Sequence, residues 1–190
     1  FDREIGGRRH YGGVKISVQP YVDLEGNHQF LFQNKLPEGE GLPDGFVESV
    51  EHGVLDQMKS GILMGHAVIG LKVGLVSADY NELDSTEMGF KAASAMALRE
   101  ALIEGESKLL EPIMAVEIVS PEEYMGDISG DINRRRGLIV GLDDLGLTKK
   151  LKAQVPLSEM FGYSTHLRSR SQGRATFTME FKNYSECPVP

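Results

Sequence analysis

The second half of the sequence changes its hydrophobic period in a fixed order, and this order constrains the fold more than any other feature. From residue 110 to 190 the pattern predicts strand, helix, strand, strand, helix, strand. Residues 151–155, for example, alternate apolar and polar side chains as a half-buried strand does. The order βαββαβ is typical of the ferredoxin-like arrangement, in which one antiparallel sheet carries both helices on one face. We therefore expect a ferredoxin-like sandwich over residues 110–190.

The first half follows a different order, with three strands and two helices. Alternation predicts strands at residues 14–18, 28–32 and 67–76, and a helical period predicts helices at residues 43–60 and 84–104. A polar segment, Glu104 to Lys108, then separates the last helix from the next apolar run. The expected fold class is α+β, with two domains at residues 1–109 and 110–190.

Two helix starts carry capping signals. Asp84 and, three residues later, Glu87 match a capping box, and Ser120 before Pro121 predicts another N-cap. In the helix after Asp84, one apolar stripe is expected to face the core. Its members are Met88, Ala92, Ala95, Met96 and Leu102.

The charge distribution restricts the partners. The formal net charge is −8, and residues 1–109 carry 10 Lys and Arg against 17 Asp and Glu. This balance excludes the broad basic face of a general nucleic-acid binder. Two segments are locally basic, however, and could contact phosphate at points. They are Arg8, Arg9 and His10, and Arg168, Arg170 and Arg174.

Several kinds of chemistry are missing from the sequence. A phosphate-binding P-loop needs a Gly-Lys pair, and the chain has none. Cys187 is the single cysteine, which rules out an internal disulfide and indicates a reducing compartment, so we expect a cytoplasmic location. The five histidines show no metal-ligand spacing, and no apolar run reaches the roughly 20 residues of a membrane span. Asp127 and Asp131 share a helix face that is more typical of a solvated or arginine-paired surface than of acid/base catalysis.

Residues 6–13 and 168–174 are the candidate binding segments. The first reads Gly-Gly-Arg-Arg-His-Tyr-Gly-Gly, and its flanking glycines allow a tight excursion that presents cations and a phenol. An ordinary β-hairpin connection with a solvated tip explains the same pattern equally well. The second segment is free of acids and is expected to lie in a loop between a helix and a strand, where its arginines favour RNA contact. For Arg134 to Arg136, by contrast, the last turn of a helix explains the charge.

Three long stretches resemble the C-terminal part of elongation factor G, a ribosomal GTPase. They are residues 84–102, residues 111–137 and residues 155–174, and their order and spacing cover nearly the whole chain. The resemblance implies a fourth domain similar to ribosomal protein S5 domain 2, with a left-handed βαβ crossover, followed by a ferredoxin-like fifth domain. It further implies that GTP and Mg²⁺ are bound by an N-terminal domain that is absent here, and Phe1 in place of Met also indicates a fragment.

The resemblance also assigns roles and partners. It implies that Arg8, Arg9, His10, Tyr11 and Asn81 contact tRNA or the decoding centre of the small ribosomal subunit. It likewise implies that Arg168, Arg170 and Arg174 approach large-subunit rRNA. The expected partners are therefore the ribosome, tRNA and mRNA. We expect a monomer that binds no membrane. The loop at residues 6–13 and Asn81 depart from the residues usual in the family, which indicates a divergent paralogue. Ribosome recycling or ribosome protection is therefore an alternative to translocation, and a small-molecule enzyme or a structural interaction module is the alternative from another class.

Overall fold

The structure is a computed structural model that describes residues 1–38 and 41–188, and it divides into two compact units, residues 1–108 and 109–190. Each is an α+β unit with its own core, so the expected fold class is confirmed. Within the described residues, no helix combines the length and the hydrophobicity needed to cross a bilayer. The elements of the first unit are β1 (Asp2–Ile5), β2 (Arg8–Tyr11), β3 (Gly13–Pro20), β4 (Phe30–Asn34), α1 (Asp44–Ser60), β5 (Leu71–Asp79) and α2 (Glu87–Glu104).

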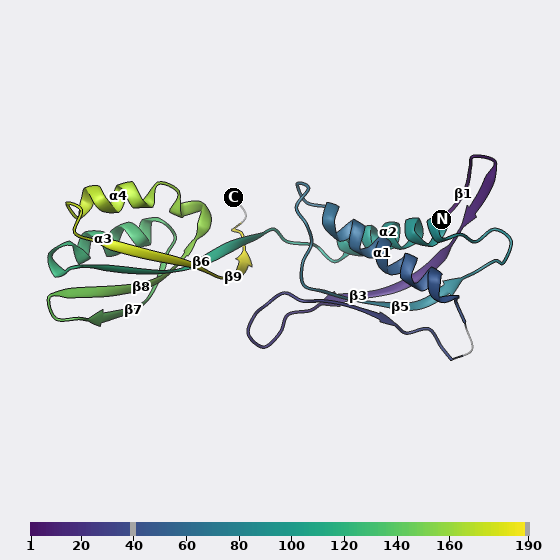
Figure 1. Cartoon of the computed structure of the whole chain (residues 1–190), viewed down its shortest axis with the longest axis horizontal. Helices are drawn as coiled ribbons and strands as arrows, with labels where there is room; N and C mark the ends of the chain where they lie inside the picture. The colour runs from purple at the N-terminus through teal and green to yellow at the C-terminus, as the bar shows by residue number, and fades with distance from the viewer. Residues whose placement is uncertain (39–40, 189–190) are drawn as a thin grey trace. The chain divides into compact units, whose positions relative to one another are not determined.

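In the first unit, β3, β5 and β4 form a sheet in that order, with β3 antiparallel and β4 parallel to β5. Helices α1 and α2 cover one face of it (Figure 1). Alternation along the strands turns Ile16, Val18 and Val73 toward these helices, where they pack in the core. The third strand begins four residues later than the period predicts, because residues 67–70 are an irregular connection.

Helix α2 corrects two predictions. Its N-cap is Thr86, whose hydroxyl oxygen accepts a hydrogen bond from the Gly89 amide at 3.0 Å, while Asp84 is engaged elsewhere. The expected apolar stripe is confirmed at Leu102, which is buried in the core, and is wrong at Met88 and Met96, which are each 50% exposed. The buried side includes Phe90 and Leu98 instead, and Ser94 lies where α2 packs closely against Gly53 of α1. This contact between the two helices, which the sequence does not show, determines which side of α2 is buried.

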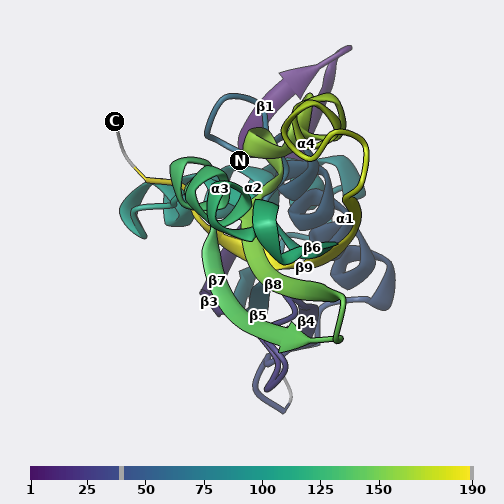
Figure 2. The same ribbon diagram turned by 90° about the vertical axis from the view of Figure 1, so that its left-hand side faces the viewer.

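The second unit confirms the βαββαβ order. Its elements are β6 (Leu110–Pro121), α3 (Glu122–Arg134), β7 (Leu138–Asp144), β8 (Thr148–Pro156), a 3₁₀ turn η1 (Leu157–Met160), α4 (Tyr163–Arg170) and β9 (Thr176–Glu186). The antiparallel sheet has the order β7, β8, β6, β9, and both helices lie on one face of it (Figures 1 and 2). Met114, Ile128 and Val155 belong to the core between sheet and helices.

Two local predictions in this unit are wrong. Ser120 does not cap α3: it is buried in β6, its hydroxyl donates to the Pro121 carbonyl at 3.2 Å, and Pro121 occupies the cap position. The loop expected at residues 168–174 is shorter than predicted, because α4 continues to Arg170. Arg168 and Arg170 therefore lie on the last helical turn, and only Arg174 lies in the loop before β9.

Candidate nucleic-acid interface

The segment rich in arginine and glycine folds as a β-hairpin at one end of the first unit. Strands β1 and β2 pair antiparallel, and their two-residue turn is Gly6-Gly7, with φ of 63° and 77°. Positive φ at both central positions is the geometry of a type I′ turn, which glycine adopts without strain. The hairpin projects beyond the helices of its unit (Figure 1), and Arg8, the first residue after the turn, is exposed.

The second pair of glycines has a different role from the first. A Cβ at Gly12 would lie 2.7 Å from the backbone of Gly89, and a Cβ at Gly13 would lie 2.8 Å from the Asp79 Cβ. These glycines therefore let the base of the hairpin pack directly against the start of α2 and the end of β5. The sequence left a tight, exposed excursion and an ordinary β-hairpin connection as equal interpretations, and the structure shows a β-hairpin with a tight turn and a close-packed base.

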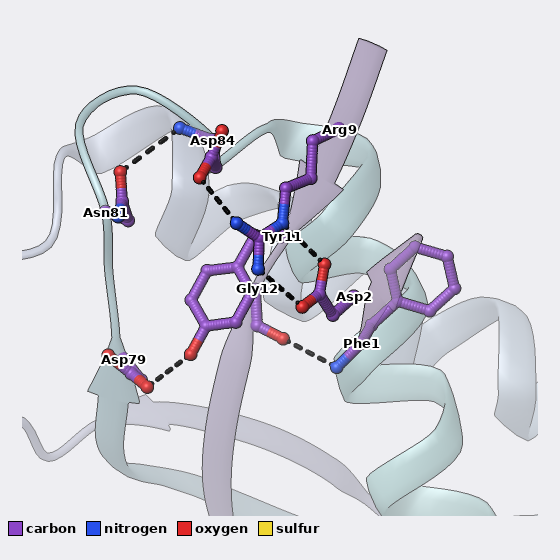
Figure 3. A network of polar contacts seen from close by, with 8 residues as sticks. All are labelled: Phe1, Asp2, Arg9, Tyr11, Gly12, Asp79, Asn81 and Asp84. Carbon is purple, nitrogen blue, oxygen red and sulfur yellow. Dashed lines mark hydrogen bonds and ion pairs between the residues drawn. The ribbon is translucent and has the colours of Figure 1, made fainter. Parts of the chain in front are cut away.

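Arg9 joins the hairpin to the loop between β5 and α2. Its Nε and Nη2 donate to the two Asp2 carboxylate oxygens at 2.8 and 2.7 Å, and its Nη1 donates to Asp84 Oδ2 at 3.0 Å (Figure 3). The hydrogen bonds from Arg9 lower the pKa of Asp2, and the Asp2 carboxylate in turn raises the pKa of Arg9. The guanidinium predicted to contact RNA thus already has two carboxylate partners within the protein.

His10 and Tyr11 also make contacts within the unit. His10 Nδ1 lies 2.9 Å from Thr86 Oγ1, the atom that caps α2. The Tyr11 hydroxyl donates to Asp79 Oδ2 (Figure 3), and this hydrogen bond raises the pKa of Tyr11 above its ordinary value. Both side chains are half-buried, so they position the base of the hairpin against α2 and β5.

Asn81 stabilises the turn in the loop between β5 and α2. Its side-chain Oδ1 accepts hydrogen bonds from the backbone amides of Leu83 at 2.9 Å and Asp84 at 3.2 Å. The backbone amide of Asn81 donates to Ser85 Oγ at 2.9 Å. An Asn oxygen that accepts from amides two and three residues ahead is a compact turn motif. Leu83, at the turn, is 88% exposed. No pattern in the sequence indicated this exposed apolar residue between the two acids that flank it.

The balance of charge at this end of the unit is acidic. The two loops and the hairpin bring together three arginines and five carboxylates. They are Arg3, Arg8 and Arg9, and Asp2, Glu4, Asp79, Glu82 and Asp84. Arg9 is occupied by two of these acids, whereas no carboxylate in residues 1–38 or 41–188 pairs with Arg8. This end of the unit therefore presents isolated cations such as Arg8 among carboxylates, rather than a continuous cationic patch.

The second set of candidate residues is spread over one helix end and the following loop. Arg168 and Arg170 are exposed, and neither has an ion-pair partner among the described residues. Cations in the last turn of α4 also offset the negative end of its dipole. Arg174 differs, because it pairs with Glu123 at 2.6 Å and lies over the Tyr124 ring.

Of the three arginines expected in the last helical turn, Arg134 lies in the last turn of α3, Arg135 is its C-cap and Arg136 follows it. Arg135 pairs with the buried Asp131 at 2.9 Å and lies over the Tyr163 ring at 5.0 Å. Arg136 pairs with Glu111 on β6. Asp131 also lies 3.1 Å from His166 Nε2, so the expectation of an arginine-paired face holds at this position. Sequence reasoning missed the participation of Tyr163 and His166, since both come from α4.

The described residues include no group of three His, Cys, Asp or Glu side chains that could hold a metal ion. An open pocket of about 230 Å³ lies on the second unit. Its lining residues include no histidine, and Arg136 and Glu111 in the lining pair with each other. Nothing in this lining combines a free base with a free nucleophile.

Comparison with known proteins agrees with this architecture. A family model described as elongation factor G, domain IV, matches residues 1–106, and one described as elongation factor G C-terminus matches residues 108–189. A Thermus thermophilus protein of known crystal structure is 30% identical, with a TM-score of 0.89 over 99% of this chain. The chain spans 27% of the length of that protein.

Proposed function

The chain belongs to the elongation factor G family, and from this we propose that it is the ribosome-binding part of a translational GTPase that promotes movement of tRNA and mRNA. The observation that carries the proposal is the match of two successive family domains across nearly all residues, together with an exposed hairpin at one end of the first domain. A cytoplasmic, monomeric parent protein is part of the same proposal.

The proposed action is steric as well as electrostatic. Arg8 and the turn before it would enter the decoding site, where Arg8 contacts phosphate and the hairpin occupies space that tRNA must leave. Arg9, His10, Tyr11 and Asn81 would line the same contact with tRNA. Their hydrogen bonds to the rest of the unit support a rigid surface, and a rigid surface can transmit displacement without deforming.

In the second unit, Arg168 and Arg170 are the residues best placed to approach large-subunit rRNA, because both are exposed and free of acidic partners among the described residues. Arg174 would take part only by exchanging Glu123 for a phosphate. These contacts would keep the second unit bound to large-subunit rRNA while the hairpin of the first unit occupies the decoding site.

We propose that GTP and Mg²⁺ are bound outside this chain. Its residues contain no Gly-Lys pair for a P-loop and, where the structure describes them, no carboxylate cluster suited to a metal. We propose that nucleotide hydrolysis occurs in a part of the parent protein outside these residues, which the 27% coverage of the Thermus protein supports.

A role in ribosome recycling or protection is the second candidate. The observation that favours it is the arrangement of the hairpin, in which Arg9 is committed to Asp2 and Asp84 and Asn81 to its own loop. A hairpin stabilised in this way has fewer free donors for tRNA than the resemblance implies.

Translocation and subunit-splitting assays on the full-length protein would distinguish these roles. We expect Arg8→Ala to slow translocation several-fold, while Arg99→Ala, an exposed arginine on α2, leaves the rate unchanged. Translocation by the unmodified protein that is no faster than without it, together with efficient subunit splitting, would establish the recycling role instead. A protein that binds no ribosomes in either assay would refute both.

A further inference from the structure

Helices α1 and α2 cover one face of the sheet of the first unit (Figure 1), and neither of them covers the other face. They pack on the side of Ile16 and Val73, so alternation along β3, β5 and β4 places the intervening positions on the other side. We call these positions the open face. They are Lys15, Ser17 and Gln19 on β3, Lys72 and Gly74 on β5, and Leu31 and Gln33 on β4, together with Ser77 on β5, which a shift in the strand register brings beside Lys15.

Three lysines gather on the open face. Lys72 stands beside Gln19 in the strand register, Lys15 stands beside Ser77, and Lys35 follows β4 directly. Lys15 and Lys35 are exposed, and Lys72 is half-buried. Within the described part of the chain, none of the three forms an ion pair.

Gly74 shapes the centre of this face. A Cβ there would lie 2.8 Å from Ser17 Oγ and 2.9 Å from Lys35 Cδ, so the Lys35 stem lies flat across the strand because position 74 has no side chain. The methylenes of Lys35 thereby cover backbone while its ammonium group remains exposed. Lys35 is thus held over the sheet rather than extending freely into solvent.

The lysines of the open face differ from several other cations of the unit. Lys59 and Lys91 both pair with Asp56, and Arg9 pairs with Asp2 and Asp84. One carboxylate, Asp79, does fall on this face at the far end of β5, and it accepts the Tyr11 hydroxyl. In a unit with 17 acids and 10 bases, three lysines without an ion-pair partner among the described residues form a distinct electrostatic surface on one face of a sheet.

We propose that the open face binds the phosphate backbone of RNA through Lys15, Lys35 and Lys72, and this rests on the proposed ribosome-binding function. The charge complementarity with a polyanion carries the argument. Its strand positions hold no aromatic ring for base stacking, so the contact is independent of RNA sequence and sensitive to salt. Gln19, Gln33 and Ser17 supply neutral hydrogen-bond partners for phosphate oxygens between the cations.

Lysine footprinting on the full-length protein tests this surface directly. The protein is acylated with an amine-reactive ester in the presence and absence of purified ribosomes, and modification of each lysine is measured by mass spectrometry. We expect Lys15, Lys35 and Lys72 to be protected at least several-fold in the complex, while Lys59, on α1, stays reactive. Equal reactivity of the three lysines in free and bound protein would overturn the proposal and leave ribosome binding intact.

A salt titration gives an independent measurement. Each phosphate contact adds about 0.7 to 0.9 to the slope of log affinity against log salt. We expect the triple variant Lys15→Gln, Lys35→Gln, Lys72→Gln to reduce the slope for ribosomes by about two to three units. The matched control is Lys59→Gln, Lys91→Gln, Arg99→Gln, which removes the same charge from the helical side and should change the slope little.

Two further probes separate the ways in which the proposal could fail. If the protein binds no ribosomes at all, the proposed function is wrong, and a short RNA duplex then tests the open face by itself. Duplex binding that is lost in the triple variant supports the proposal. Duplex binding that is unchanged in the triple variant, or absent from the unmodified protein, overturns it. Vesicles containing phosphatidylserine are the other probe. Tighter binding to vesicles than to RNA, abolished by the triple variant, would assign the face to a membrane and overturn the RNA proposal.

Discussion

Arg9 and Asp84 are 75 residues apart in the sequence, yet their side chains meet at 3.0 Å. This ion pair connects the hairpin to the loop that precedes α2, and Asp2 holds the same guanidinium from the other side. The two loops at this end of the unit are thus parts of one surface.

Arg9→Gln should loosen the hairpin without unfolding the unit. The variant loses both ion pairs, but they are exposed and contribute little to overall stability, and the backbone pairing of β1 with β2 remains. We expect hydrogen exchange of the β1 and β2 amides to accelerate several-fold, with a small change in Tm. Arg8→Gln is the control, and equal acceleration in both variants would show that Arg9 does not hold the hairpin.

Tyr11 should titrate at a higher pH than an ordinary tyrosine. Its pKa is raised from 10.0 chiefly by the hydrogen bond to Asp79, so the folded state favours the neutral phenol. The stabilisation is complete below pH 10 and is lost as pH rises through the folded pKa, because the unfolded chain ionises first. A difference titration of tyrosinate absorbance between the protein and Tyr11→Phe should show the missing group ionising above pH 10. A midpoint at or below that pH would contradict the Asp79 contact.

Gly53→Ala should destabilise the first unit. A Cβ at this position would overlap Ser94 Oγ and the Lys91 carbonyl oxygen, so α1 and α2 would have to separate. Overpacking of this kind costs about 1–3 kcal/mol in the free energy of unfolding, measurable by denaturant titration. Gly126→Ala on α3 is the matched control: nothing lies within 4 Å of its added Cβ, and a gain of about 0.5–1 kcal/mol is expected there. A similar loss in both variants would refute the close contact between α1 and α2.

Tyr163→Phe should leave the second unit equally stable or more stable. Tyr163 is 1% exposed, its hydroxyl has no hydrogen-bond partner among the described residues, and burial raises its pKa. Removing an unsatisfied hydroxyl recovers up to about 1–3 kcal/mol, whereas Tyr163→Ala, which also leaves a cavity beside Phe177, should cost about 3–5 kcal/mol. Thermal unfolding of the two variants tests this. A large loss of stability in Tyr163→Phe would mean that the hydroxyl is satisfied in solution.

The elements with a strong period were predictable. Leu151, Ala153 and Val155 alternate with Lys150 and Lys152 along β8, and the first set is buried as expected. Alternation and helical spacing are consequences of backbone geometry, so they identify strands and helices before any tertiary contact is known. The helix ends were less predictable. Thr86 and Asp84 are both competent N-cap residues; in the structure Thr86 caps α2, while Asp84 pairs with Arg9, which lies far away in the sequence.

The candidate site was predictable in its residues but not in its contacts. The glycine-flanked segment pointed to Arg8, Arg9, His10 and Tyr11, and the structure brings them together with Asn81 at one end of the unit. The linear pattern could not show that Arg9 is held by two carboxylates, because such partners are set by three-dimensional packing. The open face was likewise hidden, since Lys15, Lys35 and Lys72 are far apart in the chain and none of them belongs to a motif.

The sequence by itself determined the order of strands and helices, the two-unit organisation of the cores and the family, since periodicity and matching residues are properties of the linear chain. Only the tertiary structure decided which cations are neutralised and which remain available, because the sheet register and the packing of α1 on α2 place each lysine or arginine next to an acid or away from one. For a protein with an excess of acids, that pairing determines where a polyanion can bind.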